Sequence, residues 1–309
     1  MHPNYDHVVA PYVPQSNPEH HLASPPLLLN RASSKQYPHT LMGSRIANAF
    51  AVALRSLRPQ KYVTFLACIT GYLVVVPKPG DSLELSRLAL FFLSFTVLIY
   101  SAIYMLNDIA DRQSDMKHPI KARRLVASEA ISTRAAVVIA AALILAGLAV
   151  AIFVSPLLVF WELGFVAFNV LYTLALKKIP YVELAANAAT HPARVLLGGA
   201  LFGGLGPGVL VTATAVAAVY FSSNCLKRHF EMRNGETSLR TVLAYYRPRV
   251  LSTLALSALL AMFSLPFLAS SGRELGILLF ALCANALMIL GYYRIWPGLY
   301  RLVEYALAH

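Results

Sequence analysis

One stretch decides how this chain folds, and it reads NDIADRQSD at residues 107–115. It ends an apolar run at 86–106 and opens onto a basic segment. Asp108, Asp111 and Asp115 are spaced so that a helix of about 3.6 residues per turn places all three carboxylates on one face. Like charges at this spacing repel one another unless a cation neutralises them. Mg²⁺ is normally held by one or two carboxylates plus substrate phosphate oxygens. The stretch therefore predicts a magnesium–diphosphate site at the membrane surface, or else a solvated acidic helix end.

The composition around this stretch is that of an integral membrane protein. Of the 309 residues, 58% are hydrophobic and 13% are charged, and the mean hydropathy is +0.60. A soluble domain averages about 45–50% apolar and about 25% charged residues. The formal net charge of +12 suits loops that face anionic lipid and a site for anionic substrates better than it suits nucleic acid. Three cysteines without paired spacing suggest neither a disulfide framework nor a zinc site.

The chain divides into a tail and a membrane domain. Residues 1–44, rich in Pro, His, Asn and Ser, predict a disordered or loosely attached tail, and residues 45–309 predict the transmembrane domain. Residues 45–57 predict an interfacial helix. Eight apolar stretches follow, each near the roughly 20 residues that cross a bilayer: 62–76, 86–106, 134–154, 157–176, 181–202, 208–226, 250–269 and 274–293. Segment 296–309 is either a short ninth span or an amphipathic helix lying flat. The expected fold is an all-α, polytopic bundle of eight or nine spans.

The distribution of basic residues predicts the orientation. With the N-terminus in the cytoplasm, 22 of the 26 Lys and Arg residues fall on the cytoplasmic side, 3 fall on the other side, and Arg194 lies within a span. This asymmetry places the acidic stretch and the loop after residue 226 on the cytoplasmic face. Two long polar loops therefore share one end of the bundle.

Basic residues in both loops are candidates for binding phosphate. Lys121 and Arg124 closely follow the acidic stretch. Cations at this place would neutralise the negative phosphate charge that the metal does not balance. In the second loop Lys227 and Arg228 stand four and three residues before Glu231, so a helix lets both cations meet that carboxylate. Helix-stabilising salt bridges and ligand binding both remain open for this group.

Three further residues near the predicted cytoplasmic half are candidates for substrate binding. Arg194 lies inside an apolar run, and an intramembrane arginine indicates function unless it pairs with Glu162 or Glu183. Tyr172 and Lys177 end the fourth predicted span on the face of the two loops, where Tyr172 is either a belt residue or a headgroup contact. The small residues at 198–200 predict close helix packing.

The first motif resembles the first aspartate motif of the UbiA superfamily of intramembrane prenyltransferases. The residues that carry the resemblance are Asn107, Asp108, Asp111, Asp115, His118, Pro119 and Lys121. The similarity extends from about Leu57-Arg58-Pro59 to the eighth span. The superfamily normally has a second aspartate motif between spans six and seven, and this chain has no aspartate there. Lys227-Arg228-xx-Glu231 instead resembles the KRxxE pattern of the decaprenyl-phosphate phosphoribosyltransferase branch.

The resemblance implies a Mg²⁺-dependent transfer of 5-phosphoribose from phosphoribosyl diphosphate to a polyprenyl phosphate. Under this hypothesis the three aspartates hold the metal, with Asp108 and Asp111 also counted as catalytic, and Asn107 orients them. Lys121 and Arg124 neutralise the leaving group. Lys227 and Arg228 bind the 5-phosphate or the acceptor phosphate. Glu231 fixes the geometry of those cations or bonds a ribose hydroxyl. Lys227 and Glu231 are also counted as catalytic.

Two other functions remain open at this stage. A prenyltransferase that joins polyprenyl diphosphate to an aromatic acid in quinone biosynthesis is the nearer one, and aspartates in the second loop would have favoured it. A cation transporter is the other, although transporters place charge near the bilayer midplane and show repeated halves. The expected location is a bacterial inner membrane with the site facing the cytoplasm. The oligomeric state is left open, and a homo-oligomer is compatible with the sequence.

Overall fold

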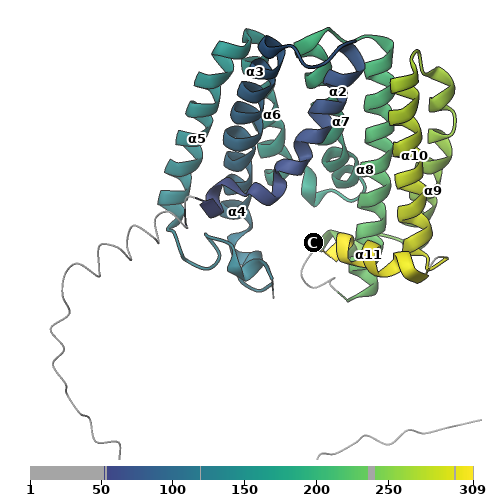
Figure 1. Cartoon of the computed structure of the whole chain (residues 1–309). Helices are drawn as coiled ribbons and strands as arrows, with labels where there is room; N and C mark the ends of the chain where they lie inside the picture. The colour runs from purple at the N-terminus through teal and green to yellow at the C-terminus, as the bar shows by residue number, and fades with distance from the viewer. Residues whose placement is uncertain (1–51, 53, 119, 236–240, 296, 309) are drawn as a thin grey trace, which may run out of the picture. The chain divides into compact units, whose positions relative to one another are not determined.

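The protein was analysed as a computed structural model that describes residues 52, 54–118, 120–235, 241–295 and 297–308 (Figure 1). Within these residues all the regular structure is helical, as the sequence predicts. The predicted tail at 1–44 lies outside the described residues, as does most of the predicted interfacial helix, of which residues 54–57 are helical.

The described α-helices are α2 (Leu66–Val75), α3 (Ser82–Phe91), α4 (Tyr100–Asp115), α5 (Thr133–Val154), α6 (Pro156–Leu174), α7 (Val182–Phe202), α8 (Pro207–Arg233), α9 (Pro248–Met262), α10 (Gly272–Tyr292) and α11 (Pro297–Ala308). Shorter helical segments connect or extend them: η1 (Pro59–Phe65), η2 (Phe92–Ile99), η3 (Lys121–Arg123), η4 (Leu176–Lys178), η6 (Thr241–Tyr245) and η7 (Leu265–Leu268). We call the end of the bundle where α4 and α8 finish, at Asp115 and Arg233, the basal end; it is the lower end in Figure 1.

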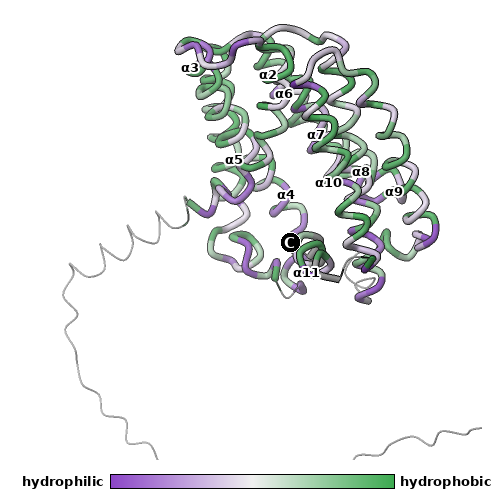
Figure 2. The backbone as a smooth tube through the Cα atoms, turned by 45° about the vertical axis from the view of Figure 1, so that its right-hand side comes forward, coloured by the Kyte–Doolittle hydropathy of each residue, from purple (hydrophilic) through white to green (hydrophobic). Residues whose placement is uncertain are grey.

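Six helical segments in the described part of the chain are long and apolar enough to cross a membrane, fewer than the eight or nine spans predicted. The difference comes from two helices. The ten residues of α2 rise only about 15 Å, and α7 has 21 residues but contains Glu183, His191 and Arg194. The 12 residues of α11 are too few for a ninth span, and Figure 1 shows this helix lying across the basal end. Figure 2 shows hydrophobic residues along the helices and hydrophilic ones gathered toward their ends.

Local signals in the sequence explain where several helices begin. The hydroxyls of Ser132, Ser155 and Ser271 accept backbone hydrogen bonds at the starts of α5, α6 and α10. Proline occupies the first position of α6, α8 and α9, where its missing N–H costs no helical hydrogen bond. These caps fix the helix ends, and with them the residues that reach the basal end.

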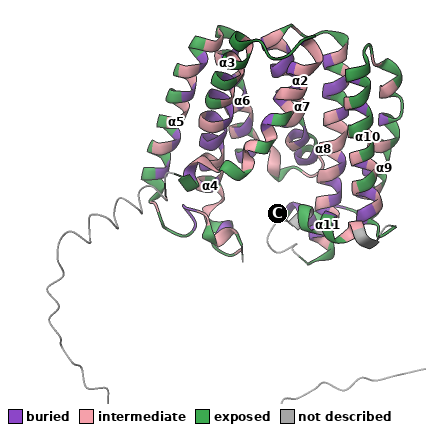
Figure 3. Cartoon of the chain, in the orientation of Figure 1, coloured by how far each residue is buried: buried purple, intermediate pink, exposed green. Residues whose placement is uncertain are grey.

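Helix α7 is the most enclosed element, with α2 and α8 packed against it. A Cβ atom added to Gly198 would lie 2.0 Å from the carbonyl oxygen of Cys68, and one added to Gly71 would lie 2.0 Å from that of Val195. The backbones of α2 and α7 are therefore in direct contact, which confirms the close packing predicted from the small residues at 198–200. Figure 3 shows α7 largely buried, whereas α5 and α9 are mostly exposed at the edges of the view.

The helix that carries the aspartates is not a regular α-helix throughout. Residues from Ser82 to Asp115 form one continuous helical segment of 34 residues. Its middle, η2, is a π-helix over Phe92–Ile99, where the apolar pattern alone predicts an ordinary span. Within η2 the hydroxyl of Ser94 donates to the carbonyl oxygen of Gly147 at 2.8 Å and also contacts the Glu162 carboxylate. The π-helix is thus joined to α5 and α6.

Candidate active site

The three aspartates of the first motif lie on α4 at the basal end. Asp108 and Asp115 are buried, whereas the side chain of Asp111 is 34% exposed. We refer to Asp108, Asp111 and Asp115 as the acidic face. The helix places two carboxylates inside the protein and leaves the middle one open to solvent or a ligand.

Each carboxylate of the acidic face is paired with a cation. Arg58 binds Asp108, and Lys177 binds Asp111. Arg124 bridges the two buried aspartates, with Nη1 2.7 Å from Asp115 Oδ2 and 3.3 Å from Asp108 Oδ1. Three cations therefore balance three carboxylates. Two of these cations, Arg124 and Lys177, are among the candidates for substrate binding predicted from the sequence.

Arg58 holds its place through an unusual backbone conformation. It directly precedes the Pro59 that opens η1, and its φ of 48° and ψ of 58° lie in the left-handed region that non-glycine residues seldom adopt. Sequence reasoning noticed Arg58 only as part of the opening of the first helix. The sequence signal at this position is an arginine directly before a proline. This signal does not reveal the partner, Asp108, which lies 50 residues further along the chain.

Asn107 and Lys121 lie beside the acidic face. The side-chain oxygen of Asn107 accepts a hydrogen bond from the hydroxyl of Thr173 on α6, a residue that sequence reasoning missed. Lys121, in the segment after α4, contributes positive charge near Asp115. The structure thus places Asn107, the predicted orienting residue, at the same end of α4 as Lys121 and Arg124, the cations predicted in the first loop.

Arg228 lies at the centre of a second group near the end of α8. Its Nε and Nη2 bind the two carboxylate oxygens of Glu183 at 2.5 and 2.9 Å, and its Nη1 binds both oxygens of Glu231 at 2.9 Å. The hydroxyl of Tyr246 donates to Glu183 at 2.8 Å. We call these four residues the Arg228 cluster. All four are buried, and Glu183 has no exposed surface.

The Arg228 cluster joins three parts of the chain. Glu183 begins α7, Arg228 and Glu231 end α8, and Tyr246 follows η6. Burial, together with the negative charge of Glu183, raises the pKa of Tyr246, so its phenol stays protonated and donates. The predicted pairing of Arg228 with Glu231 is confirmed, but binding to Glu183 was not foreseen. Direct phosphate binding by Arg228 stays a prediction, because the nitrogens on its guanidinium already face carboxylates.

The end of α6 reaches both groups of charged residues. Thr173 bonds Asn107 and Lys177 binds Asp111, both on α4. Tyr172 accepts a 3.5 Å hydrogen bond from Asn187 of α7 and lies near Arg228. Half-buried Lys227 directly precedes Arg228 on α8. The predicted residues from α4, α6 and α8 are therefore connected through neighbouring side chains, although they are far apart in the sequence.

The acidic face fits a hard cation in the kind of ligand it offers. It presents carboxylate oxygens, and the buried Oδ1 of Asp108 forms an ion pair with Arg124 at 3.3 Å but accepts no hydrogen bond. Among the described residues, no three His, Cys, Asp or Glu side chains converge into a ready-made metal cage. Such an open arrangement suits Mg²⁺, which takes part of its coordination from substrate phosphate and water.

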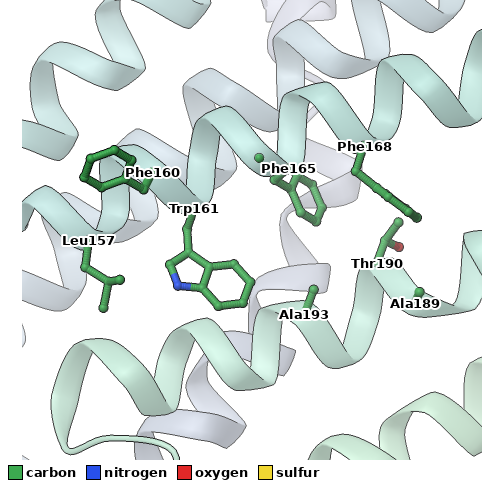
Figure 4. Close-up of a pocket in the computed structure, with 9 residues that line it drawn as sticks. Leu157, Phe160, Trp161, Phe165, Phe168, Ala189, Thr190 and Ala193 are labelled. Carbon is green, nitrogen blue, oxygen red and sulfur yellow. The ribbon is translucent and has the colours of Figure 1, made fainter.

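An apolar cavity of about 420 Å³ lies between α6 and α7. Figure 4 shows aromatic side chains of α6, among them Trp161 and Phe165, across from Thr190 and Ala193 of α7. Leu157 and Phe160 extend the lining to the exposed flank of the bundle. The sequence alone does not indicate this cavity, because it forms where two helices pack together.

Comparison with known proteins gives a consistent family. The model of the UbiA prenyltransferase family matches residues 64–299. Among curated proteins, decaprenyl-phosphate phosphoribosyltransferase from Mycobacterium tuberculosis is 28% identical over 156 residues, which are 50% of this chain and 51% of that protein. The chain thus spans about half the length of the curated relative it matches.

Two solved structures share the fold. A UbiA homolog from Archaeoglobus fulgidus bound to GPP and Mg²⁺ has a TM-score of 0.64 and 16% identity, and the match covers 82% of this chain and 98% of that one. A UbiA homolog from Aeropyrum pernix K1, in its apo form, has a TM-score of 0.58 and 19% identity, with 84% and 94% covered. At these identities the likeness shows the fold alone.

Proposed function

Because the chain belongs to the UbiA prenyltransferase family, we propose that it transfers 5-phosphoribose from phosphoribosyl diphosphate to a polyprenyl phosphate, with release of diphosphate. The observation that carries this proposal is the Lys227-Arg228 pair at the end of α8, at the place where prenyl-transferring members of the superfamily have further aspartates. A donor with a 5-phosphate brings extra negative charge, which cations accommodate and aspartates repel. The similarity to the mycobacterial phosphoribosyltransferase supports the same branch.

The acidic face is the proposed diphosphate end of the site. Asp108, Asp111 and Asp115 are the residues that would hold Mg²⁺, which would supply positive charge against the departing diphosphate. Arg58 and Lys177, which pair with these carboxylates, are placed to contact diphosphate oxygens once a ligand enters. Arg124 and Lys121 add positive charge beside Asp115.

Residues around α6 and α8 are the proposed sugar-phosphate end. Lys227 would bind the 5-phosphate, with Tyr172 nearby as a contact for the sugar phosphate. We assign Arg228 to positioning, because Glu183 and Glu231 hold its guanidinium on both sides. Glu231, both of whose carboxylate oxygens accept from Arg228, would accept a further hydrogen bond from a ribose hydroxyl. Asn107, held by Thr173, orients the donor on the opposite side.

The reaction needs little proton transfer. An oxygen of the acceptor phosphate attacks ribose C1, the bond from C1 to the diphosphate oxygen breaks, and its electron pair leaves with diphosphate. The acceptor phosphate is already ionised near neutral pH, so no general base is required. Cations around the leaving group stabilise the charge that builds up in the transition state.

The assay that tests this function uses the purified full-length protein in lipid nanodiscs. Labelled phosphoribosyl diphosphate, polyprenyl phosphate and Mg²⁺ should give a lipid-soluble product in the wild type. Asp111→Ala and Lys227→Ala should abolish most of it, and a chelator should abolish it in the wild type. Equal label in the lipid fraction with all three proteins would rule out the assignment.

Transfer of a prenyl group to an aromatic acid is the second candidate, and the family and the Archaeoglobus fulgidus complex with GPP and Mg²⁺ favour it. The same nanodiscs with labelled polyprenyl diphosphate and an aromatic acid decide between the two. Product in this arm alone would replace the phosphoribosyl assignment. For either reaction we propose a bacterial inner membrane with the basal end in the cytoplasm, on the basis of the distribution of Lys and Arg.

A further inference from the structure

Arg194 is a buried cation for which the described residues supply no carboxylate partner. Its side chain is 1% exposed, and its Nη1 donates to the carbonyl oxygen of Thr190 at 2.9 Å and lies 3.3 Å from Nδ1 of His191. Its Nη2 is buried without a hydrogen-bond partner. The two glutamates considered as partners are engaged elsewhere: Glu162 with Ser94, and Glu183 with Arg228.

Aromatic rings offset part of the cost of burying this charge. The guanidinium carbon lies 4.5 Å from the ring centre of Tyr100 and 5.1 Å from that of Phe165. A cation over an aromatic face regains only part of the free energy that is lost when an ion is removed from water. Arginine does not deprotonate in proteins, so the charge persists. The balance favours an anion at the free edge of the guanidinium.

A chain of side-chain contacts connects Arg194 to the acidic face. Tyr100, which stacks on Arg194, shares a 3.2 Å hydrogen bond with Tyr104. The guanidinium of Arg58 lies 5.0 Å from the Tyr104 ring centre and binds Asp108. Tyr100 precedes Asp108 by two helical turns, which corresponds to about 12 Å along the helix. Arg194 therefore lies on the membrane side of the proposed diphosphate site.

Arg194 also lies directly behind the α6–α7 cavity. The cavity is lined by Phe165, whose ring Arg194 contacts, and by Thr190, whose carbonyl oxygen accepts from Arg194. The rest of the lining is apolar, and Leu157 and Phe160 carry it to the exposed flank (Figure 4). A ligand with an anionic headgroup and a long apolar chain fits this arrangement, because the headgroup can bind the cation while the chain occupies the apolar cavity.

We propose that Arg194 binds the phosphate of the polyprenyl acceptor, and that the α6–α7 cavity holds the first isoprenoid units of its chain. This assignment rests on the proposed function, which it deepens by giving the acceptor its own subsite. The donor lies on the acidic face, and the acceptor phosphate approaches from the membrane side. A terminal phosphate oxygen that Arg194 does not bind attacks ribose C1, the bond from C1 to the diphosphate oxygen breaks, and its electron pair leaves with diphosphate.

A binding measurement tests the subsite without requiring turnover. The chain has two tryptophans, so Trp296→Phe leaves Trp161, in the cavity lining, as the only tryptophan, whose fluorescence can be excited selectively at long wavelength. In this background, nanodiscs are titrated with polyprenyl phosphate and with the matching polyprenol. We expect about 30-fold tighter binding of the phosphate, and loss of that preference in Arg194→Gln. Arg134→Gln, at the exposed start of α5, is the matched control and should keep the preference.

Kinetics separate this role from a structural one. Arg194→Gln should raise KM for polyprenyl phosphate about 30-fold and leave the affinity for phosphoribosyl diphosphate unchanged, with Arg194→Lys intermediate. Ala193→Phe, which fills the cavity, should raise KM for a long-chain acceptor more than for a ten-carbon one. A general structural defect would instead weaken the binding of both substrates.

The outcomes are distinguishable. A preference for phosphate over polyprenol that survives in Arg194→Gln overturns the subsite. A wild type that shows this preference and yet forms no phosphoribosyl lipid overturns the proposed function, while the phosphate site stands. Equal binding of polyprenyl phosphate and polyprenol by the wild type overturns the subsite whichever reaction is observed.

Discussion

The acidic face and the Arg228 cluster use the same chemistry, carboxylates paired with cations, in different surroundings. In the acidic face Asp111, Lys177 and Arg124 keep contact with solvent, with side-chain exposures of 34%, 23% and 29%, although Asp108 and Asp115 are buried. In the Arg228 cluster all the partners are buried, and the arginine is held by two carboxylates. Partly exposed pairs cost little to separate, whereas a buried pair that loses one partner leaves an uncompensated charge. The first arrangement suits exchange with a ligand, and the second suits fixing helices.

The strongest test of this contrast is Asp111→Asn. It keeps the shape of the side chain and removes the charge that faces Lys177. We expect the transfer rate to fall about 10³-fold, while the melting temperature stays close to that of the wild type. Initial rates and thermal unfolding in the same detergent check both expectations. Asp81→Asn, exposed next to the start of α3, is the control. A rate within tenfold of the wild type would contradict the prediction.

Glu183→Ala tests the other side of the comparison. It leaves Arg228 buried with one carboxylate partner fewer, so the free energy of unfolding should fall by about 3 kcal/mol. Adding Arg228→Met should recover much of that loss, because a buried pair replaced by apolar groups is often neutral. Thermal unfolding of the single and double variants measures this coupling. A double variant as unstable as the single one would show that the cluster does not act as a pair.

Thr173→Ala tests whether the α6 contact orients the donor. Without the hydroxyl, Asn107 loses its partner across the interface between α4 and α6. KM for phosphoribosyl diphosphate should rise about fivefold, which corresponds to about 1 kcal/mol, and KM for the lipid should not change. Thr70→Ala, which removes a hydroxyl bonded to the Leu66 carbonyl oxygen in α2, is the control. An equal rise in both KM values would argue against a donor-specific role.

Tyr246→Phe should have the smallest effect. Removing the hydroxyl that donates to Glu183 should lower the free energy of unfolding by about 1 kcal/mol. Burial raises the pKa of Tyr246 above its usual 10.0, so the hydroxyl's contribution is fully present below pH 10 and is lost as the pH rises above that value. The difference in melting temperature between wild type and variant should therefore be constant from pH 7 to pH 9.5 and shrink at higher pH. A difference that shrinks below pH 9 would contradict the raised pKa.

Contacts within one helix were predictable from the sequence, and contacts between helices were not. The shared face of Asp108, Asp111 and Asp115 and the pairing of Arg228 with Glu231 follow from helical spacing. Arg58 and Asp108 are 50 residues apart, Glu183 and Arg228 are 45 apart, and Asp111 and Lys177 are 66 apart. These pairs depend on which helices pack together, and the hydropathy of the sequence does not indicate which helices are neighbours.

The fold was predictable in class but not in the number of long spans. Apolar runs identify α5, α6, α8, α9 and α10 because these helices have apolar lengths near the thickness of a bilayer. Helix α7 departs from the pattern because it is enclosed by its neighbours and so tolerates Glu183 and Arg194, whose surroundings are protein rather than lipid. The same enclosure explains why its polar residues include several site candidates.

The π-helix η2 determines which way the acidic face points. A π turn accommodates about one residue more than an α turn, and each residue of an α-helix turns the chain by about 100°. If the same eight residues formed an α-helix instead, the extra residue would no longer be absorbed, and Asp108, Asp111 and Asp115 would lie about 100° further around the helix axis, roughly a quarter turn. The direction of the acidic face is thus set by an angular offset in an apolar segment, which ends about two and a half helical turns before Asp108.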